Sequence, residues 1–398
     1  MNTEARQTSQ EHRLEPYFQP ILSLQTQSIL GYEALGRRID GGRVYSLGPF
    51  FHDHTIGEEQ HLNVDRLLRE KAIAVMAQVQ KESEALLFLN LKPSWIYRMY
   101  KKTGQLPTLQ LLEKHGLDPS RVVIEITEEE FHGRLDELSA IINVYRERGC
   151  LVAIDDIGSG YSNYDRIASI KPNILKIDLK LLKQSALHDG YKALLNSFSI
   201  LSSQMGSSLL VEGVETKQDL YYAMKAGARY VQGFLFSEAQ PGLQDPGAYE
   251  RLLKEEIRHY TEQEVTRYRS LFSIQDSLSG LVTSDVNVSS AHEADAVIES
   301  LLSGVTGSVE RVYICSEDGC QISSNYVRSA DGGWQRDSRY QGSNWIWRPY
   351  FIPNMLRMSS QQQGMISQEY TDLDTSRLMQ TYSCPIGGSN YLFLDLSV

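Results

Sequence analysis

The residues best suited to chemistry are acids, amides and one lysine that lie where short apolar runs end. They are Glu33, Asn90, Glu125, Asp155, Asp156, Lys176, Glu212 and Gln232. If these runs are strands of a parallel barrel, the side chains meet at one mouth, because barrel active sites lie at the carboxyl ends of the strands. Carboxylates held close together repel one another unless a cation offsets their charge. The pattern therefore predicts a site for divalent metal ions.

The oxygen-rich character of this set indicates which metal and which reaction to expect. Carboxylate and amide oxygens suit Mg²⁺ or Mn²⁺, and the lack of histidine in the set weakens a zinc interpretation. The adjacent Asp155 and Asp156 suit two ions, because one carboxylate can bridge both. Such pairs of ions activate the attacking water and the leaving oxygen of a phosphoryl displacement. Lys176 adds a positive charge for the negative charge that develops in that reaction.

Strands and helices alternate from Leu14 to Pro241, as a barrel requires. The eight strand candidates are YFQPILSL, SILGYEALG, ALLFLNL, RVVIEIT, CLVAIDD, ILKID, SLLVEG and YVQGFLF. Amphipathic segments between them include 59–80, 135–148, 191–205 and 216–226. This order predicts an α/β fold, a TIM-like (β/α)₈ barrel. Only 25–27 separates the first two strands, which is too short for a crossover helix, so we expect one antiparallel strand and a modified barrel.

The pattern changes between 246 and 282, where spacings of three and four alternate. The series is Tyr249, Leu253, Ile257, Tyr260, Glu264, Arg267, Leu271, Ile274, Leu278 and Leu281. This spacing predicts one long connecting helix. Two interpretations stay open: an amphipathic helix that packs on the barrel, or a signalling helix that pairs with a second copy of the chain.

The last part of the chain, 283–398, is richer in glycine, serine and asparagine and holds three of the four tryptophans. A helical segment at 291–302 precedes the strand candidates RVYICS, GCQISSNYV, GMISQEYTD, RLMQTYSCPI and NYLFLDLSV. Short strands of this kind after a helix predict a small α/β domain with an antiparallel sheet.

The composition limits the class of protein. The 398 residues carry a formal charge of −11, with 41% hydrophobic and 22% charged residues. This is typical of a globular protein of two or three domains, and it excludes a collagenous or largely disordered chain. The acidic balance argues against binding of long nucleic acid. No apolar run is long enough to span a membrane.

The amino-terminal segment and the cysteines favour a cytoplasmic location. Residues 1–13 are polar, lack the apolar segment of a secretory signal and are expected to form a disordered tail. The four cysteines form no CxxC pair and no zinc-like cluster. We therefore expect reduced, packed thiols.

An ordered set of motifs over Leu14 to Pro241 makes the chain recognisable. YFQPILSL, GYEALGR, IEITEEE, AIDDIGSGYSN, LKID, VEGVET and VQGFLF follow one another. The segment resembles the EAL family of cyclic di-GMP phosphodiesterases. This resemblance implies that a divalent metal activates a water, which hydrolyses one phosphodiester of cyclic di-GMP. The product is linear pGpG, so the reaction lowers the level of this bacterial second messenger. The predicted EAL barrel covers 14–245.

The resemblance also assigns roles to individual residues. Glu33, Asn90, Glu125 and Asp155 are similar to the ligands of a first metal, and Asp155 and Asp156 to those of a second. Glu212 resembles the general base, Lys176 the lysine that holds the nucleophilic water, and Glu128 the glutamate that anchors the loop after the acidic pair. The implied substrate contacts are Gln19, Leu35, Arg37, Glu215 and Gln232. Ca²⁺ is expected to bind without supporting efficient turnover.

The chain departs from the family pattern at three positions. Ile157 replaces the usual Phe, Ser159 the usual Thr, and Lys92 a common Ser. None of these changes removes an implied metal ligand, which favours an active enzyme. Two alternatives stay open: a non-catalytic cyclic di-GMP receptor that uses the same pocket, and an unrelated barrel phosphohydrolase.

The remaining sequence is similar to the PAS-like, EAL-associated domain of firmicute EAL proteins. The similar stretches over the whole chain are GYEALGR, SLGPFF, NWIWRPYF and YLFLDL. This implies a regulatory domain over 283–398 and a homodimer. Trp345, Trp347, Arg348 and Tyr350 could line a pocket for a small anionic regulator. The alternative is that these aromatics belong to the core and that Arg348 forms a structural ion pair.

Overall fold

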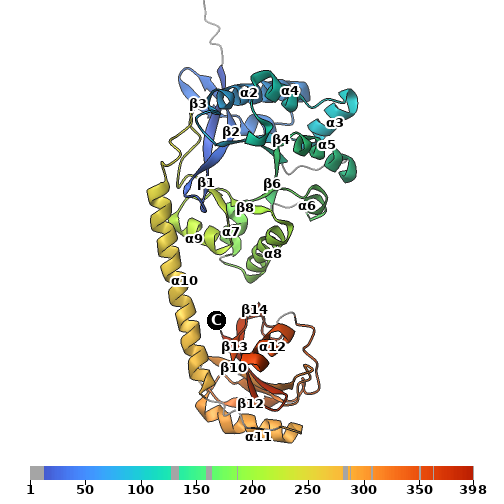
Figure 1. Ribbon diagram of the computed structural model, residues 1–398, viewed down its shortest axis with the longest axis vertical. Coiled ribbons are helices and arrows are strands. Elements are labelled where there is room, and N and C mark those ends of the chain that lie inside the picture. Colours follow the sequence, from blue (N-terminus) through green and yellow to red (C-terminus); the bar gives the residue numbers. More distant parts are fainter. Residues whose placement is uncertain are drawn as a thin grey trace, which may run out of the picture. The chain divides into compact units, whose positions relative to one another are not determined.

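The chain forms two compact units, Met1–Tyr260 and Thr261–Val398 (Figure 1). The computed structural model describes residues 13–126, 134–157, 164–185, 187–280, 286, 288–305, 308–348, 351–361 and 363–397, without the side chains of Asp156 and Asp189. Most of the predicted tail, together with Glu128, Ser159 and Tyr350, therefore lies outside the described residues.

The first unit is a closed barrel. Its strands are β1 (Arg13–Ser23), β2 (Ser28–Asp40), β4 (Leu86–Leu91), β5 (Val122–Ile126), β6 (Leu151–Ile157), β7 (Ile174–Ile177), β8 (Ser208–Val211) and β9 (Tyr230–Gln232). The strand order is β1-β9-β8-β7-β6-β5-β4-β2, and pairing of β1 with β2 closes it. β1 is antiparallel to both neighbours, whereas the other barrel pairs are parallel. The predicted modified (β/α)₈ barrel is confirmed.

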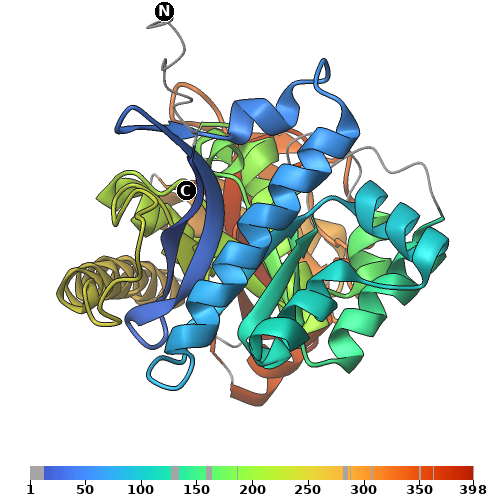
Figure 2. The ribbon, with the colours of Figure 1, turned by 90° about the horizontal axis from the view of Figure 1, so that it is seen from above.

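Helices follow the parallel strands. They are α2 (Glu58–Val79), α3 (Pro93–Thr103), α4 (Pro107–His115), α5 (Leu135–Glu147), α6 (Tyr164–Ile170), α7 (Leu179–Ser185), α8 (Asp189–Met205) and α9 (Lys217–Lys225). α2 packs on β1, β2 and β4, outside the sheet (Figure 2). Pro93 and Pro107 begin α3 and α4, where a missing N–H costs nothing. Gly104 ends α3 at a φ of 66°, which glycine adopts without strain.

Apolar side chains fill the lower barrel interior directly beneath the polar ones. A buried cluster contains Ile21, Phe88, Val123, Ala153, Ile174 and Leu210. The last five of these lie two residues before Asn90, Glu125, Asp155, Lys176 and Glu212, respectively. Because side chains alternate between the two faces of a strand, residues two apart share a face. The polar residues therefore point into the barrel at its mouth, and the apolar residues of the buried cluster lie one layer below them.

A short insertion that we did not predict lies between β2 and α2. It contains β3 (Arg43–Ser46), which forms a hairpin with β2, and α1 (Gly48–His52).

One prediction is corrected: the strand expected over YVQGFLF ends at Gln232, because the chain turns at Gly233. Gly233 has a φ of 158°, and a Cβ atom there would lie 2.1 Å from the Val214 carbonyl oxygen.

The second unit is an α/β domain with an antiparallel sheet, as predicted. Its helices are α11 (Ala291–Leu301) and α12 (Phe351–Gln361). Its strands are β10 (Val309–Ser316), β11 (Asn325–Arg328), β12 (Trp334–Asp337), β13 (Met365–Ile366), β14 (Tyr370–Thr371), β15 (Leu378–Gly387) and β16 (Asn390–Ser397). The sheet order is β12-β11-β10-β16-β15-β13, and β14 also pairs with β15. We predicted neither β12 nor α12. The chain also contains two described 3₁₀ turns, Pro119–Arg121 and Leu302–Gly304.

The connecting helix is α10 (Glu250–Ser279). Its predicted seam packs in part against the chain itself: Leu253 joins the core of the barrel unit, and Leu278 joins the core of the second unit. Leu281, the last residue of the predicted seam, lies outside the described residues. This arrangement favours the amphipathic-helix interpretation for the seam. A different face of α10, carrying Val265, Tyr268 and Phe272, is exposed.

Two further expectations can be compared with the described residues. All four cysteines are free thiols, and three of them, Cys150, Cys315 and Cys384, are buried. Among the described helices, none combines the length and the apolar character that crossing a bilayer requires.

Candidate active site

The centre of the barrel mouth is a lysine surrounded by acids. The Lys176 Nζ atom lies 2.7 Å from Glu125 Oε1, 2.6 Å from Glu212 Oε1, 3.4 Å from Asp155 Oδ1 and 4.0 Å from Glu33 Oε2. Lys176 and Glu125 have no exposed side-chain surface. Strands β2, β5, β6 and β7, with the residue after β8, therefore bring together five residues that the sequence singled out.

A chain of amides holds Glu33 in place. Asn90 Nδ2 donates a hydrogen bond to Glu33 Oε1 at 2.6 Å, and Gln232 Nε2 donates to Glu33 Oε2 at 2.8 Å. Gln232 Nε2 also lies 3.1 Å from Gln19 Oε1, while Gln19 Nε2 donates to the Ser237 carbonyl oxygen. The register explains the proximity, since Gln19 faces Glu33 across the β1–β2 pair. The structure thus places Gln19 and Gln232 beside the acidic cluster.

Burial shifts the pKa values of several charged groups in the cluster. Burial raises the pKa of the Glu125 carboxyl well above its ordinary value, although the nearby Lys176 charge opposes this. Burial and the charge of Asp155 likewise raise the pKa of Glu212. Burial alone would lower the pKa of Lys176, but the surrounding carboxylates outweigh it and raise that pKa well above its usual range. One buried lysine is too little positive charge for so many acids.

The donor chemistry of the site fits a divalent cation. Glu125 Oε2 is buried and accepts no hydrogen bond from the described residues. The surrounding donors are hard oxygens, which Mg²⁺, Mn²⁺ and Ca²⁺ prefer. In the described part of the chain, no three Asp, Glu, His or Cys side chains already surround a common point as metal ligands do. The Lys176 ammonium lies among the carboxylates instead.

A cavity of about 560 Å³ opens beside this cluster. Asn90 and Asp155 line it, as do Leu35 and Arg37, two of the predicted substrate contacts. Arg37 is half-buried, and its guanidinium lies 5.8 Å from the centre of the Tyr17 ring. Burial lowers the pKa of Arg37, but an arginine remains charged at any physiological pH. The cavity is therefore lined both by the positively charged Arg37 and by residues of the acidic cluster.

Three positions that the sequence analysis singled out are not seen to contribute a side chain to the cluster. Glu215 lies on the surface, with its side chain 51% exposed and Lys183 3.3 Å away, rather than in the cluster. Ile157 is completely buried in the barrel core. Asp156 lies in β6 beside Asp155, but its side chain is outside the described part.

Sequence reasoning did not assign a role to several residues that line the cavity. Lys92 and Trp95, at the start of α3, share it with Phe51 of α1 and with His52 and His54. The signal was available for Lys92, because it follows Asn90 by two residues at the end of β4. Phe51 and the two histidines carry no such signal, since they reach the cavity only through the β3–α1 insertion.

The aromatic residues predicted for a regulatory pocket cluster around Arg348. Its guanidinium carbon lies 5.1 Å from the Trp345 ring centre, 5.3 Å from that of Trp347 and 5.2 Å from that of Tyr370. Trp345 Nε1 donates to the buried Gln321 Oε1 at 3.0 Å, whereas Trp347 is 62% exposed. Trp345 is thus partly buried against the core of the second unit, whereas Trp347 is exposed.

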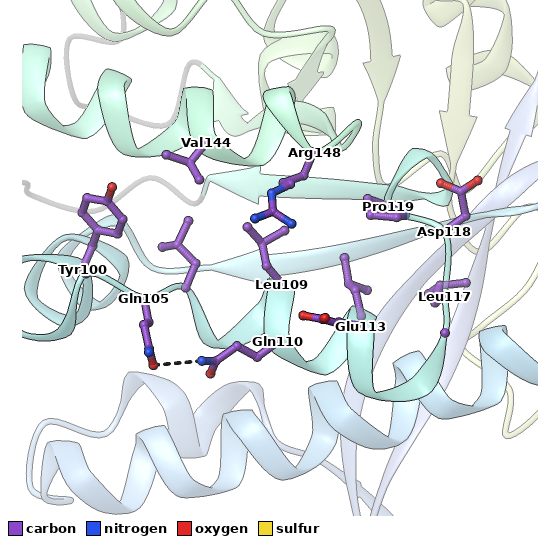
Figure 3. Close-up of a pocket in the computed structure, with 14 residues that line it drawn as sticks. Tyr100, Gln105, Leu109, Gln110, Glu113, Leu117, Asp118, Pro119, Val144 and Arg148 are labelled. Atoms are coloured by element: carbon purple, nitrogen blue, oxygen red, sulfur yellow. Dashed lines mark hydrogen bonds between the residues drawn. The ribbon is translucent and has the colours of Figure 1, made fainter.

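A second hollow, of about 630 Å³, lies between α3, α4 and α5 (Figure 3). It is lined by Tyr100, Gln110, Glu113, Asp118 and Arg148, among others. Asp118 and Arg148 precede β5 and β6, so this hollow reaches the amino-terminal ends of the strands. That end of a barrel contributes to stability rather than to chemistry.

Comparison with known proteins identifies the two domains of the chain. An EAL domain model matches residues 2–239, and a model of the EAL-domain associated signalling protein domain matches 245–398. The chain is 34% identical over 96% of its length to YkuI of Bacillus subtilis, described as an uncharacterized EAL-domain containing protein, and covers 93% of it.

Solved structures give a similar result. The crystal structure of the Bacillus subtilis YkuI protein in complex with substrate c-di-GMP and calcium superposes with a TM-score of 0.87, at 34% identity, over 97% of this chain and 96% of that one. A Klebsiella pneumoniae BlrP1 complex with manganese and cyclic di-GMP matches at 27% identity and a TM-score of 0.51, over 58% and 57% of the two chains. With the acidic mouth and both domain matches in place, the chain belongs to the EAL-domain family and carries the EAL-associated signalling domain behind its barrel.

Proposed function

We propose that the barrel is a metal-dependent phosphodiesterase that hydrolyses cyclic di-GMP to linear pGpG. The observation that carries this proposal is the buried Lys176 among Glu33, Glu125, Asp155 and Glu212, beside a cavity with a cationic wall. The c-di-GMP complexes of YkuI and BlrP1 support the choice of substrate.

Each residue has a distinct task in this proposal. Glu33, Asn90, Glu125 and Asp155 would hold the first divalent ion, and Asp155 and Asp156 a second. When bound, such ions act as Lewis acids that lower the pKa of the attacking water and stabilise the leaving oxygen.

The remaining residues act on protons and on charge. Glu212 is the partly exposed acid of the cluster, with 26% of its side chain accessible, so it can accept a proton from water. Lys176 stabilises the negative charge that develops on the phosphoryl oxygens. Water attacks the phosphorus and gives its proton to Glu212, the bond between phosphorus and the ribose 3′ oxygen breaks, and that oxygen takes a proton from solvent water. Arg37 and Leu35 hold the substrate in the cavity.

The test is the product formed from cyclic di-GMP with Mg²⁺ or Mn²⁺, separated by chromatography. We expect pGpG from the unaltered chain and none from Glu33→Ala, which loses a metal ligand. Glu84→Ala removes an exposed acid and serves as the matched control, with unchanged turnover. Tight binding without pGpG would instead establish the non-catalytic receptor, and full activity of Glu33→Ala would show that the metal site is misplaced.

Three broader expectations stay predictions: regulation by the second unit, a cytoplasmic location and a homodimer. The exposed Val265, Tyr268 and Phe272 on α10 are suited to helix pairing, because they follow one another at spacings of three and four. Light scattering at micromolar concentration should give twice the monomer mass. A monomeric mass that persists on concentration would contradict the dimer.

A further inference from the structure

Two cations face the substrate cavity without a carboxylate partner among the described residues. They are Arg37 and Lys92. A third cation in the lining, Arg69, is already neutralised, because it pairs with Asp65 and donates to Thr108 Oγ1. Arg37 and Lys92 are only partly buried, so their charges can meet anionic groups of a ligand, and the cavity wall is suited to such groups in more than one place.

Lys92 is held in a defined position by its neighbours. Its Nζ atom donates to the Phe51 carbonyl oxygen at 3.2 Å and lies 4.7 Å from the centre of the Trp95 ring. An ammonium carries three N–H donors, so Lys92 keeps donors for a ligand after this bond is made. The side chain is therefore preorganised at the cavity wall, two residues beyond the Asn90 that holds Glu33.

The chemistry of the substrate fits this arrangement. A cyclic dinucleotide carries two phosphodiesters, and only one of them can lie at the acidic cluster during hydrolysis. We propose that Lys92 binds the phosphodiester that is not cleaved, and that Trp95 positions the ammonium for this contact. The proposal rests on the function proposed above, and it concerns a residue that stands where the family commonly has a serine.

The proposal separates binding from chemistry. A charge-assisted contact to the uncleaved phosphodiester is made equally in the bound substrate and in the transition state, so its loss should raise KM and leave kcat nearly unchanged. Because linear pGpG keeps the uncleaved phosphodiester, its affinity should fall with that of the cyclic substrate.

The experiment measures binding of cyclic di-GMP and of pGpG by calorimetry in Ca²⁺, and steady-state turnover in Mg²⁺. Lys92→Ser should weaken binding of both nucleotides by about 10-fold, the size expected for one charged hydrogen bond. Lys92→Gln keeps a donor for Phe51 but removes the charge, and it should weaken binding as strongly. Lys92→Arg should restore most of the affinity. Trp95→Leu should weaken binding to a smaller extent. Lys102→Ser removes an exposed charge from the same helix and should change nothing.

Three results would overturn the proposal. Unchanged affinity in Lys92→Gln with loss in Lys92→Ser would show that Lys92 only ties the α1 segment through Phe51. A fall in kcat with unchanged affinity would place Lys92 at the scissile phosphate. Equal binding of cyclic di-GMP by the unaltered chain and by Lys92→Ser would overturn the role of Lys92 alone. Failure of the unaltered chain to bind and to hydrolyse cyclic di-GMP would instead overturn the proposed function.

Discussion

Each unit of the molecule contains a buried basic side chain among several acids, and the two clusters differ in their access to a cavity. In the barrel, Lys176 lies among Glu33, Glu125, Asp155 and Glu212. In the second unit, Arg311 contacts Asp372, Asp374 and Asp395. The barrel cluster adjoins a cavity through Asp155, whereas Arg311 and Asp395 are neighbours across β10 and β16 inside the sheet.

Hydrogen bonding differs between the two clusters at Asp372 and at Glu125. Asp372 accepts two bonds from Arg311, at 3.1 and 3.0 Å, and two more from Thr375. Burial tends to raise the pKa of Asp372, but these donors outweigh it and lower that pKa. In contrast, Glu125 Oε2 accepts no hydrogen bond from the described residues, and burial raises the pKa of Glu125. Asp395 Oδ2 in the second unit is also buried without a hydrogen bond, so the feature that suits the barrel cluster to a cation is its place at a cavity.

The largest expected effect is the loss of turnover in Glu125→Gln. This change keeps the shape of the side chain but removes a ligand charge, so kcat should fall by more than about 100-fold, beyond the loss typical of residues that only orient ligands. Unfolding in denaturant should show equal or greater stability, because a buried carboxylate is gone. Retained turnover would mean that the barrel cluster is structural as well.

Arg311→Met should have the opposite signature. It leaves Asp372 and Asp395 buried without their cation, which should cost the second unit about 3–5 kcal/mol of unfolding free energy. Tryptophan fluorescence reports this unit, since Trp334, Trp345 and Trp347 lie in it. Arg339→Met, at an exposed ion pair with Asp337, is the matched control and should change little. Equal stability of the two variants would remove the distinction between the clusters.

Divalent ions should stabilise the barrel unit and leave the second unit unaffected. A ligand that binds only the folded state adds about 2.7 kcal/mol at one hundred times its Kd. Titration with Ca²⁺ should therefore raise the melting temperature of the unaltered chain but not that of Glu125→Gln. An identical rise in both proteins would place the bound ions elsewhere.

The smallest effect is expected from Arg348→Ala. Contacts between a cation and aromatic rings at a partly exposed site are worth about 1 kcal/mol, so stability of the second unit should fall only slightly. Basal hydrolysis of cyclic di-GMP should not change. If stability collapses instead, Arg348 is a structural residue, and the regulatory-pocket interpretation fails.

Sequence reasoning reached the barrel cluster because the strand period leaves a strong signal. Glu125 and Asp155 end apolar runs, and their partners two residues earlier form the buried floor. Lys92 was noted only as a departure from the family, although its spacing of two residues from Asn90 at the end of β4 was a usable signal. The Arg311 cluster left no signal at all. Arg311, Asp372 and Asp395 are far apart in the chain, and only the antiparallel register brings them together.

The most direct test of the central claim, that the acidic cluster at the barrel mouth binds the cations that act on cyclic di-GMP, is a crystal structure with this nucleotide and Ca²⁺. We predict calcium bound by Glu33, Asn90, Glu125 and Asp155, with one phosphodiester against it and no cation at Arg311. Calcium bound away from these four residues, or a nucleotide that does not reach them, would contradict the account.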